Sequence, residues 1–257
     1  MPSDSFPNKF DEKLAEVWPD FVVCSQRMKA EAPFLNQILN MYEVPRVLDA
    51  ATGMGCETTW LLRRGIDVTS NEINPTMQRI AESYASSQGL CLRLRNHDWL
   101  YFDTEYEYDS FDITLLLGNS LCLVKSMVDR EKVAANLWKI CASGGIVVVD
   151  ERNFRYIEGE SQAILNGDFR YSGKYMYCGN LITAIPIKIL PQEVTFAFRN
   201  GISNELIAEV DMYPFKRGEI RDLFENAGFK LHALYSDFQV GESDLADFFT
   251  YIFKKVD

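Results

Sequence analysis

The sequence predicts an α/β protein with a doubly wound parallel sheet, and three observations lead to this prediction. Apolar, strand-like runs alternate with amphipathic helical segments between residues 46 and 150, which is typical of a parallel sheet with helices on its faces. A glycine turn, Gly53-Met54-Gly55, joins the first strand-like run to a helix. After Asp150 the alternation stops and β segments follow one another, which predicts an antiparallel insert.

The first half of the chain predicts two helices followed by the alternating part. Helix 8–20 has apolar residues at helical spacing and ends at Pro19, and helix 25–42 contains Pro33, which marks a kink or a restart. The elements that follow are a strand that ends at Asp49, helix 56–64, strand 67–71, helix 75–88, strand 90–95, strand 111–117, helix 128–141 and strand 145–150.

The second half predicts an antiparallel meander and a final helix with two strands. The meander has turn residues at Pro191 and Asn200-Gly201 and consists of the β segments 174–187, 190–199 and 204–213. We expect it to lie over the carboxyl ends of the parallel strands, where open sheets bind ligands. The last elements are helix 216–227, which ends at the glycine cap Gly228, and strands 229–238 and 247–255.

Composition limits the class of protein. A chain of 257 residues with 47% apolar residues forms one large domain, or one domain with a sizeable insertion. The net charge of −11 and the lack of a basic stripe argue against a nucleic-acid partner. The polar N-terminus and the short apolar runs predict a soluble, cytoplasmic protein without a membrane segment.

The cysteines and histidines predict neither disulfides nor a metal site. The six cysteines are scattered and form no C-x-x-C pair, so we expect reduced, mostly buried thiols. His97 and His232 are the only histidines, which excludes a histidine-rich metal centre.

The glycine turn predicts a nucleotide-bearing cofactor. One glycine takes backbone angles forbidden to other residues, and the other lets a ligand approach the main chain closely. The helix behind the turn presents free N–H groups. Glu72 ends the next strand, nineteen positions after Gly53, which is the spacing of a carboxylate that binds ribose hydroxyls. The alternative is a tight turn in some other α/β protein, with Glu72 at a solvated strand end.

The residues around the turn distinguish between cofactors. The dinucleotide fingerprint requires a third glycine where this chain has Thr58, which disfavours a nicotinamide cofactor. Asp49, four residues before Gly53, and the acid-tipped second strand instead resemble class I methyltransferases, which use S-adenosyl-L-methionine. This resemblance implies that Gly53 and Gly55 pass under the methionine part of the cofactor. It also implies that Glu72 holds the ribose and that Asp49 meets the ammonium group.

Four further stretches narrow the resemblance. They are Leu117-Gly118-Asn119-Ser120, Asp150-Glu151-Arg152-Asn153-Phe154, Tyr175-Met176-Tyr177-Cys178-Gly179 and Asp211-Met212-Tyr213-Pro214. In this order they resemble glycine N-methyltransferase and the bacterial glycine/sarcosine N-methyltransferases, whose stretches read LGNSF, D-x-RNY, YYC-G and Y/F-P. The resemblance extends from about Trp18 to Lys255.

The resemblance implies a domain organisation. The fold is then the seven-stranded, Rossmann-like methyltransferase sheet with an antiparallel β lid inserted after the fifth strand. Residues 1–152 and 214–257 form the cofactor-binding core, with a helical cap over residues 1–42. Residues 153–213 form the lid and part of the acceptor pocket.

The resemblance also implies further cofactor contacts. Trp18 and Arg27 match a tryptophan and an arginine that clamp the cofactor; alternatively, Trp18 anchors the core and Arg27 lies on a solvated helix face. Asp98 and Trp99 match the adenine contacts, where a carboxylate accepts from the exocyclic amine beside a stacking indole; alternatively, Asp98 is an exposed loop residue. Leu117 contributes its backbone. The expected cofactor-binding residues are Trp18, Arg27, Asp49, Ala51, Gly53, Gly55, Glu72, Asp98, Trp99 and Leu117.

Arg152 is the main candidate for substrate binding. The matching arginine of the family binds the carboxylate of the amino acid, and a guanidinium fork fits that group with two hydrogen bonds. A buried arginine is costly unless it is paired, and the alternative partners are Glu151 and Glu72. Tyr177 and Tyr213 match tyrosines that line the acceptor pocket; alternatively, they are packed strand aromatics. The expected catalytic residues are Asn119, Arg152, Tyr177 and Tyr213.

Three stretches depart from the family pattern. Leu123 replaces the histidine after LGNSF, and Phe154 replaces the tyrosine of RNY and is followed by Arg155 instead of aspartate. A pocket tyrosine that follows G-D-F in the family has no counterpart after Ser236-Asp237-Phe238. These changes indicate a less polar pocket, and hence an acceptor that is larger or more apolar than glycine.

The sequence thus predicts an enzyme that transfers a methyl group from S-adenosyl-L-methionine to the amine of a small, carboxylate-bearing metabolite such as glycine, sarcosine or a related amino acid. It could also form a homo-oligomer. One alternative is an N- or O-methyltransferase of a specialised metabolite, which the departures favour. A second is a non-catalytic cofactor-binding protein with the same fold.

Overall fold

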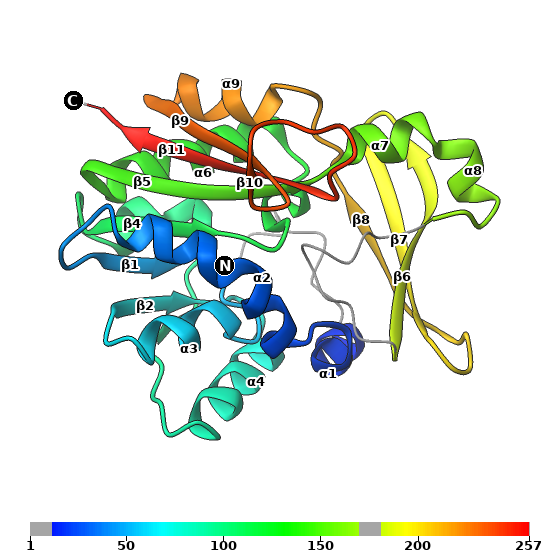
Figure 1. Cartoon of the computed structure of the whole chain (residues 1–257), viewed down its shortest axis with the longest axis horizontal. Helices are drawn as coiled ribbons and strands as arrows, with labels where there is room; N and C mark the ends of the chain where they lie inside the picture. The colour runs from blue at the N-terminus through cyan, green and yellow to red at the C-terminus, as the bar shows by residue number, and fades with distance from the viewer. Residues whose placement is uncertain (1–11, 170–180, 257) are drawn as a thin grey trace.

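The computed structural model describes residues 12–169 and 181–256, which form two sheets flanked by helices (Figure 1). The main sheet has the order β10-β9-β11-β5-β4-β1-β2-β3, and a separate three-stranded sheet has the order β6-β7-β8. The strands of the main sheet are β1 (Arg46–Asp49), β2 (Asp67–Asn71), β3 (Leu94–Arg95), β4 (Phe111–Leu116), β5 (Cys141–Arg152), β9 (Phe229–Ser236), β10 (Gln239–Val240) and β11 (Phe248–Lys255).

The predicted doubly wound sheet is confirmed. β1 pairs in parallel with both β2 and β4, and β4 pairs in parallel with β5. β11 runs antiparallel between β5 and β9. The order of the strands therefore reverses between β1 and β4, and in open sheets a ligand binds outside the carboxyl ends of the strands at that point.

The main sheet has eight strands and not the expected seven. The additional strand is β10, which folds back on the end of β9 and pairs Gln239 with Ser236. The two residues between the strands, Asp237 and Phe238, both have positive φ angles, 46° and 62°. Two successive residues of this kind form the tight turn that suits a two-stranded hairpin. The sequence prediction extended the strand through residue 238, because neither residue is a glycine that would mark the turn.

Helices cover both faces of the main sheet. The described α-helices are α1 (Glu12–Phe21), α2 (Cys24–Leu39), α3 (Cys56–Leu62), α4 (Pro75–Ser86), α5 (Phe102–Glu105), α6 (Met127–Ile140), α7 (Phe154–Gly159), α8 (Ser161–Leu165) and α9 (Glu219–Asn226), and the 3-10 helices are η1 (Trp99–Tyr101) and η2 (Ser120–Leu123). Pro19 lies inside α1 and does not end it. The proline removes only its own N–H, and the helix closes beyond it with a bond from the Val22 N–H to the Trp18 carbonyl.

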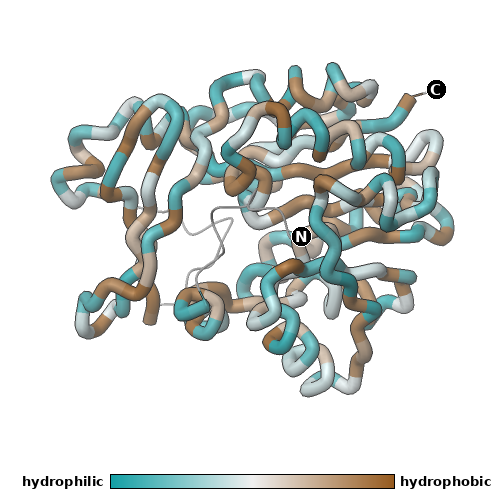
Figure 2. Tube along the Cα trace, turned by 180° about the vertical axis from the view of Figure 1, so that it is seen from behind, coloured by the Kyte–Doolittle hydropathy of each residue, from teal (hydrophilic) through white to brown (hydrophobic). Residues whose placement is uncertain are grey.

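The core consists of two apolar layers, one on each face of the main sheet. Alternate strand residues point to opposite faces, so Val47 joins one layer and Leu48 the other. The Val47 layer includes residues of α2 and α3, and the Leu48 layer includes residues of α6 and α9. Figure 2 shows the apolar character concentrated along the strands.

The insert after β5 begins with α7 and α8, which the sequence prediction missed, and continues into an antiparallel sheet. Its strands are β6 (Ile182–Leu190), β7 (Glu193–Asn200) and β8 (Leu206–Met212). The insert lies at the end of β5 (Figure 1). Trp18 and Phe21 of α1 pack on Phe198 of β7, with ring centroids 6.0 and 5.2 Å apart. Helix α1 therefore connects the insert to the core.

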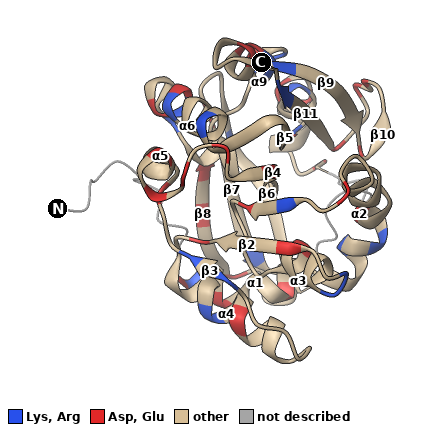
Figure 3. Ribbon diagram, turned by 90° about the vertical axis from the view of Figure 1, so that its left-hand side faces the viewer, with Lys and Arg blue, Asp and Glu red and all other residues tan. Residues whose placement is uncertain are grey.

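Charge of both signs lies on the outer helices. In Figure 3, Lys and Arg are interspersed with Asp and Glu on α4 and α6. Among the described residues, no helix combines the length and the apolar character that crossing a bilayer requires.

Candidate cofactor and acceptor site

The glycine turn has the backbone that the sequence predicted. Gly53 and Gly55 have φ angles of 56° and 83°, in the left-handed region, and Gly55 caps the N-terminus of α3. A side chain at Gly55 would be strained by this left-handed backbone, while its Cβ atom would meet Ala81 at an ordinary contact distance of 3.5 Å. The Gly53 N–H donates to Oε2 of Glu72 at 2.9 Å. The turn and the acid of the second strand are therefore in direct contact.

Glu72 is held at the tip of β2 by backbone groups on both sides. Its Oε1 accepts from the N–H of Asn74 at 2.8 Å, while its Oε2 accepts from Gly53. Burial raises the pKa of the Glu72 carboxyl to about 7, against the opposing effect of these backbone bonds. Each carboxylate oxygen has two lone-pair sites, so both oxygens can still accept hydrogen bonds from a ligand.

The loop with Asp98 and Trp99 is bonded to the same strand ends. The indole N–H of Trp99 donates to the Ala50 carbonyl at 2.8 Å. The side chain of Asn71 exchanges hydrogen bonds with the backbone of His97, at 3.0 and 2.9 Å. Asp98 accepts from the N–H of Leu100 at 2.9 Å and starts η1. The structure thus brings this loop beside the glycine turn, while its contact with adenine stays a prediction.

Asp49 and Arg27 lie in a buried network beneath the turn. The Thr58 hydroxyl, at the position of the missing third glycine, donates to Asp49 Oδ2 at 2.6 Å. Burial, followed by the nearby Glu57, raises the pKa of the Asp49 carboxyl to about 7. Arg27 forms ion pairs with Glu31, at 3.0 Å, and with Glu57. Arg27 is therefore not on a solvated face, and its role toward the cofactor stays a prediction.

The remaining predicted cofactor residues differ in their surroundings. Trp18 packs on Phe21, with ring centroids 5.0 Å apart, and on the insert residue Phe198. These contacts are the ones expected if Trp18 anchors the core. Leu117 is buried, and its carbonyl accepts from the Ser120 hydroxyl at 2.6 Å. Ala51 is half-buried in the loop that precedes the glycine turn. Their contacts with the cofactor also stay predictions.

Asn119 and Arg152 meet at the ends of β4 and β5. Asn119 is buried, and its Oδ1 accepts from the backbone N–H of Arg152 at 3.0 Å. Its Nδ2 lies 3.5 Å from Sδ of Met212, at the end of β8. The Arg152 guanidinium lies 4.7 Å from the ring centroid of Phe196 and 4.8 Å from that of Phe248. The core strands and the insert thus converge on Arg152.

Neither of the acids proposed as a structural partner of Arg152 forms an ion pair with it in the described part of the chain. Glu151 instead accepts from the Tyr251 hydroxyl at 2.5 Å. Glu72 is bonded to the glycine turn and the start of α4. Burial raises the pKa of the Glu151 carboxyl to about 8. These two alternatives for Arg152 are therefore wrong.

The two predicted pocket tyrosines have different outcomes. The Tyr213 hydroxyl donates to Glu219 Oε1 at 2.7 Å, and the Arg130 guanidinium lies 3.7 Å from the centroid of its ring. Its backbone N–H bonds to the Cys122 carbonyl at 2.8 Å. Tyr213 therefore connects the end of the insert to α9 and to the loop after β4. Tyr177 lies outside the described residues.

Sequence reasoning assigned no role to two polar residues at the end of β5. The carboxylate of Asp150 accepts from the backbone N–H groups of the loop that contains Asn119. The side-chain amide of Asn153 donates to the carbonyls of Asp244 and Ala246, at 3.0 and 2.9 Å. The signal was available, because both residues belong to the D-x-RN stretch at the end of a buried strand.

The expectation of reduced cysteines is wrong for one pair. Cys24 and Cys56 form a disulfide across a sequence separation of 32, with their Cα atoms 5.2 Å apart. They are the first residues of α2 and α3, so only the packing of these two helices brings them together. Cys122 and Cys141 are buried free thiols, and Cys91 is exposed.

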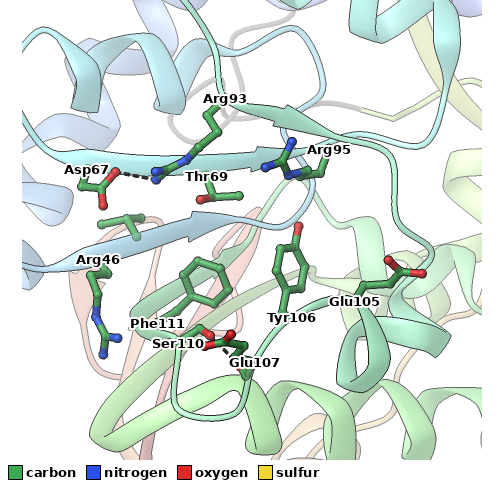
Figure 4. A pocket seen from close by; sticks show the side chains of 11 residues that line it. Arg46, Asp67, Thr69, Arg93, Arg95, Glu105, Tyr106, Glu107, Ser110 and Phe111 are labelled. Carbon is green, nitrogen blue, oxygen red and sulfur yellow. Dashed lines mark hydrogen bonds and ion pairs between the residues drawn. The ribbon is translucent and has the colours of Figure 1, made fainter.

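A cavity of about 340 Å³ lies at the other end of the parallel strands (Figure 4). Its lining includes Arg46 and Asp67, which begin β1 and β2, and Tyr106 from the loop before β4. Because the glycine turn follows the carboxyl end of β1, this cavity is not the cofactor site. Arg46 is bonded to Asp112, and Arg93 in the lining is paired with Asp67.

Comparison with known proteins identifies the domain. Residues 47–145, which contain the glycine turn and Glu72, match the model of a methyltransferase domain. The glycine/sarcosine N-methyltransferase of Aphanothece halophytica is 29% identical over 254 residues, covering 98% of this chain and 92% of that protein.

Solved methyltransferase structures share the fold. An S-adenosylmethionine-dependent methyltransferase from Clostridium acetobutylicum has a TM-score of 0.71 at 18% identity, covering 95% of this chain and 98% of that one. A methyltransferase from Bacteroides fragilis in complex with S-adenosyl-L-homocysteine has a TM-score of 0.58 at 16% identity, covering 100% of this chain and 98% of that one. These structures have the mixed α/β architecture described above.

The predictions of an enzyme, and of S-adenosyl-L-methionine as its cofactor, are confirmed. The nicotinamide and non-catalytic alternatives are wrong. The described residues fit this cofactor, since the left-handed glycine turn lets a ligand approach the main chain closely and Glu72 has lone pairs on both carboxylate oxygens for two ribose hydroxyls.

Replacing Glu72 by Ala should weaken binding of the cofactor. The change removes charge-assisted hydrogen bonds worth about 1.5–3 kcal/mol each, so the affinity for S-adenosylhomocysteine should fall at least about tenfold by calorimetry. Asp67→Ala, at the opposite end of β2, is the matched control and should bind normally. Wild-type affinity in Glu72→Ala would show that this carboxylate does not hold the ribose.

The buried acids should make the ligand-free protein less stable as the pH rises. The raised pKa values of Asp49, Glu72 and Glu151, about 7, 7 and 8, mean that the folded state retains protons that the unfolded chain has already released. The protonated carboxyl groups therefore favour the folded state. This contribution to the free energy of unfolding is fully present below about pH 4 and is lost as the pH rises through 7–8. The Tm should therefore fall by several degrees between pH 6 and pH 8.5, and Glu151→Gln should flatten this dependence. If the Tm of Glu151→Gln fell with pH as steeply as that of the wild type, the raised pKa of Glu151 would not be a cause of the pH dependence.

The Cys24–Cys56 disulfide should contribute to stability. Closing a loop of this length is worth about 3–4 kcal/mol in the chain-entropy model, so Cys24→Ser should lower the Tm and abolish its dependence on dithiothreitol. Cys91→Ser, which removes an exposed thiol, is the control and should leave both unchanged. A Tm that is insensitive to reductant in the wild type would argue against the disulfide.

Proposed function

We propose that this enzyme transfers a methyl group from S-adenosyl-L-methionine to the amine of glycine, sarcosine or a closely related amino acid. The observation that carries the proposal is the position of Arg152 beside Asn119, at the carboxyl ends of two parallel strands and against the insert. The similarity to a glycine/sarcosine N-methyltransferase along 98% of the chain supports the same substrate class.

Arg152 is suited to bind the carboxylate of such a substrate. Its guanidinium lies near two aromatic rings, Phe196 of the insert and Phe248 of β11, and the residue is buried. Limited access of water strengthens the attraction between a guanidinium and a carboxylate. The planar fork can donate two parallel hydrogen bonds and thereby fix the direction of the substrate as well as its position.

The protein's contribution to the reaction is mainly alignment. The bound cofactor supplies an electrophilic methyl group on a sulfonium, and the amine attacks it in line. Arg152 would hold the acid end of the substrate, and Asn119 would fix the backbone from which Arg152 projects. We propose that the amine binds in its neutral form, because a protonated amine has no lone pair with which to attack the methyl group. Holding reactants close and aligned can supply about 7–11 kcal/mol.

Residues 153–213 would act as a lid that shapes the acceptor pocket. Phe196 of β7 contacts the Arg152 guanidinium, and Met212 at the end of β8 lies beside Asn119. Ion pairs from Lys125, after β4, to Glu193 and Asp211 connect the lid to the core, at 3.2 and 3.0 Å. The proposed cofactor residues lie mainly on other segments, so acceptor selection and cofactor binding should be separable.

The structure accounts for two departures from the family pattern without a change of substrate class. Phe154 is buried in the core at the start of α7. A phenylalanine suits this apolar position, because it has no hydroxyl group that would need a hydrogen-bond partner there. Arg155 forms an ion pair with Glu242 at 2.6 Å. Leu123 packs against the core layer and is half-buried, and an apolar residue there favours a larger acceptor. Methylation of a specialised metabolite at N or O is therefore retained as the second candidate.

Replacing Arg152 should reduce activity while sparing the cofactor. Arg152→Lys should already cost activity, because a point charge cannot reproduce the two-pronged contact. Arg152→Ala should cost about 2–5 kcal/mol in kcat/KM for the amino acid, as expected when one partner of a buried charge pair is lost. Affinity for S-adenosylhomocysteine should hardly change in calorimetry. Arg221→Ala, which breaks an exposed pair on α9, should behave like the wild type in both measurements.

A second set of substrates tests the same proposal. Amines that lack a carboxylate should be poor substrates of the wild type. Their kcat/KM should hardly change in Arg152→Ala. Mass spectrometry could instead find efficient methylation of a neutral amine or a phenol that persists in Arg152→Ala. Arg152 would then be structural, and methylation of a specialised metabolite would be the function.

A further inference from the structure

The carboxylate of Asp150 binds two successive backbone N–H groups across the sheet. Asp150 lies on β5, two residues before Arg152, and is 1% exposed. Its Oδ2 accepts from the N–H of Gly118 at 2.9 Å, and its Oδ1 accepts from the N–H of Asn119 at 2.6 Å. Both oxygens of one buried carboxylate are thus used to hold the loop that follows β4.

This loop has a backbone that needs such a partner. Gly118 and Asn119 have φ angles of 81° and 59°, so two consecutive residues are left-handed. Successive N–H groups of this kind form a concave site for an anion. Asn119 has a Cβ atom, so the left-handed conformation costs it conformational energy that a glycine would not lose. Without a carboxylate, the buried N–H of Asn119 and the half-buried N–H of Gly118 would lose their acceptor, at a cost that is larger for the buried group.

The loop in turn sets the position of the substrate arginine. The Asn119 side chain accepts from the Arg152 N–H at 3.0 Å and lies 3.5 Å from Met212 Sδ. Asp150 and Arg152 are two positions apart on one strand, so both point to the same face of the sheet. The hydrogen bonds therefore connect Asp150 to the loop, and Asn119 of the loop to Arg152, two residues further along β5.

We propose that Asp150 is a positioning residue for methyl transfer, which acts through the Gly118-Asn119 loop on Arg152. The inference rests on the proposed function of Arg152 and Asn119. An ionised carboxylate is the side chain suited to this position, because the isosteric amide of asparagine offers one acceptor and places an NH₂ donor against the second N–H. Asp150→Asn should therefore keep the shape of the site and release one of the two loop bonds.

The kinetic test compares Asp150→Asn with a matched control. A displacement of about 1 Å in a reacting group can cost about 100-fold in rate, so kcat should fall about 10- to 100-fold, while affinity for S-adenosylhomocysteine stays within about threefold. Asp112→Asn removes a carboxylate that accepts from the Arg46 N–H at the other end of β4, and its kcat should stay at the wild-type value. If Asp150→Asn does not fold, Asp150→Glu serves in the same comparison.

A double variant tests whether Asp150 acts through Asn119. If it does, Asp150→Asn combined with Asn119→Ala should lower kcat no further than the more damaging single change does. Additive losses would overturn the proposal, because they would mean that Asp150 acts independently of the loop. A wild-type kcat in Asp150→Asn would overturn it too.

Amide hydrogen exchange separates this inference from the proposed function. The Gly118 and Asn119 amides should both be protected in the wild type, and in Asp150→Asn the one amide that loses its acceptor should exchange at least about tenfold faster. Unchanged exchange would refute the role of Asp150 whichever substrate the enzyme uses. If glycine and sarcosine are not methylated, the proposed function fails, while the exchange result still decides the loop, and kinetics then use whichever amine is methylated.

Discussion

The arrangement of the site depends on one constraint, which is that backbone groups must find hydrogen-bond partners where the parallel strands end. Beyond its last ladder bond, each strand leaves N–H and C=O groups without a partner in the sheet. Here side chains supply partners across neighbouring strand ends: Glu72 accepts from Gly53, Asn71 bonds to His97, and Asp150 accepts from Gly118. The edge that we propose to bind ligands is therefore also cross-bonded by side chains.

Much of the arrangement of the candidate site could be predicted because its signals are local in the sequence, while the contacts with ligands stay predictions. A turn with Gly53 and Gly55 followed by an acid at the next strand end needs only short segments to recognise, and the juxtaposition of Asn119 and Arg152 followed from the order of the strands. The Cys24–Cys56 disulfide could not be predicted this way, since it depends on how two helices pack. Short elements such as β10 and α8 were missed because so few residues carry little periodicity.

Burial at the cofactor end carries a cost in stability. Glu31, Asp49 and Glu57 lie beneath the glycine turn with Arg27 between two of them, and burial raises the pKa of Glu31 well above its ordinary range. A protein selected for stability alone would place apolar side chains here. Acids with raised pKa values gather at functional sites, and the position of this group directly under the turn is consistent with that pattern.

The structure also suggests why acceptor specificity can change while the cofactor site stays the same. The proposed cofactor contacts come mainly from the parallel part of the sheet, whose residues are bonded to one another at the strand ends. The proposed acceptor contacts come from Arg152 and from an insert that packs on the core through apolar residues of its sheet and through contacts at Phe198, Lys125 and Tyr213. A substitution on the insert, such as one at Phe196, therefore alters the surroundings of Arg152 without disturbing the bonds between Glu72 and the glycine turn. The departures at Leu123 and Phe154 follow the ends of β4 and β5 and lie apart from the bonds between Glu72 and the glycine turn.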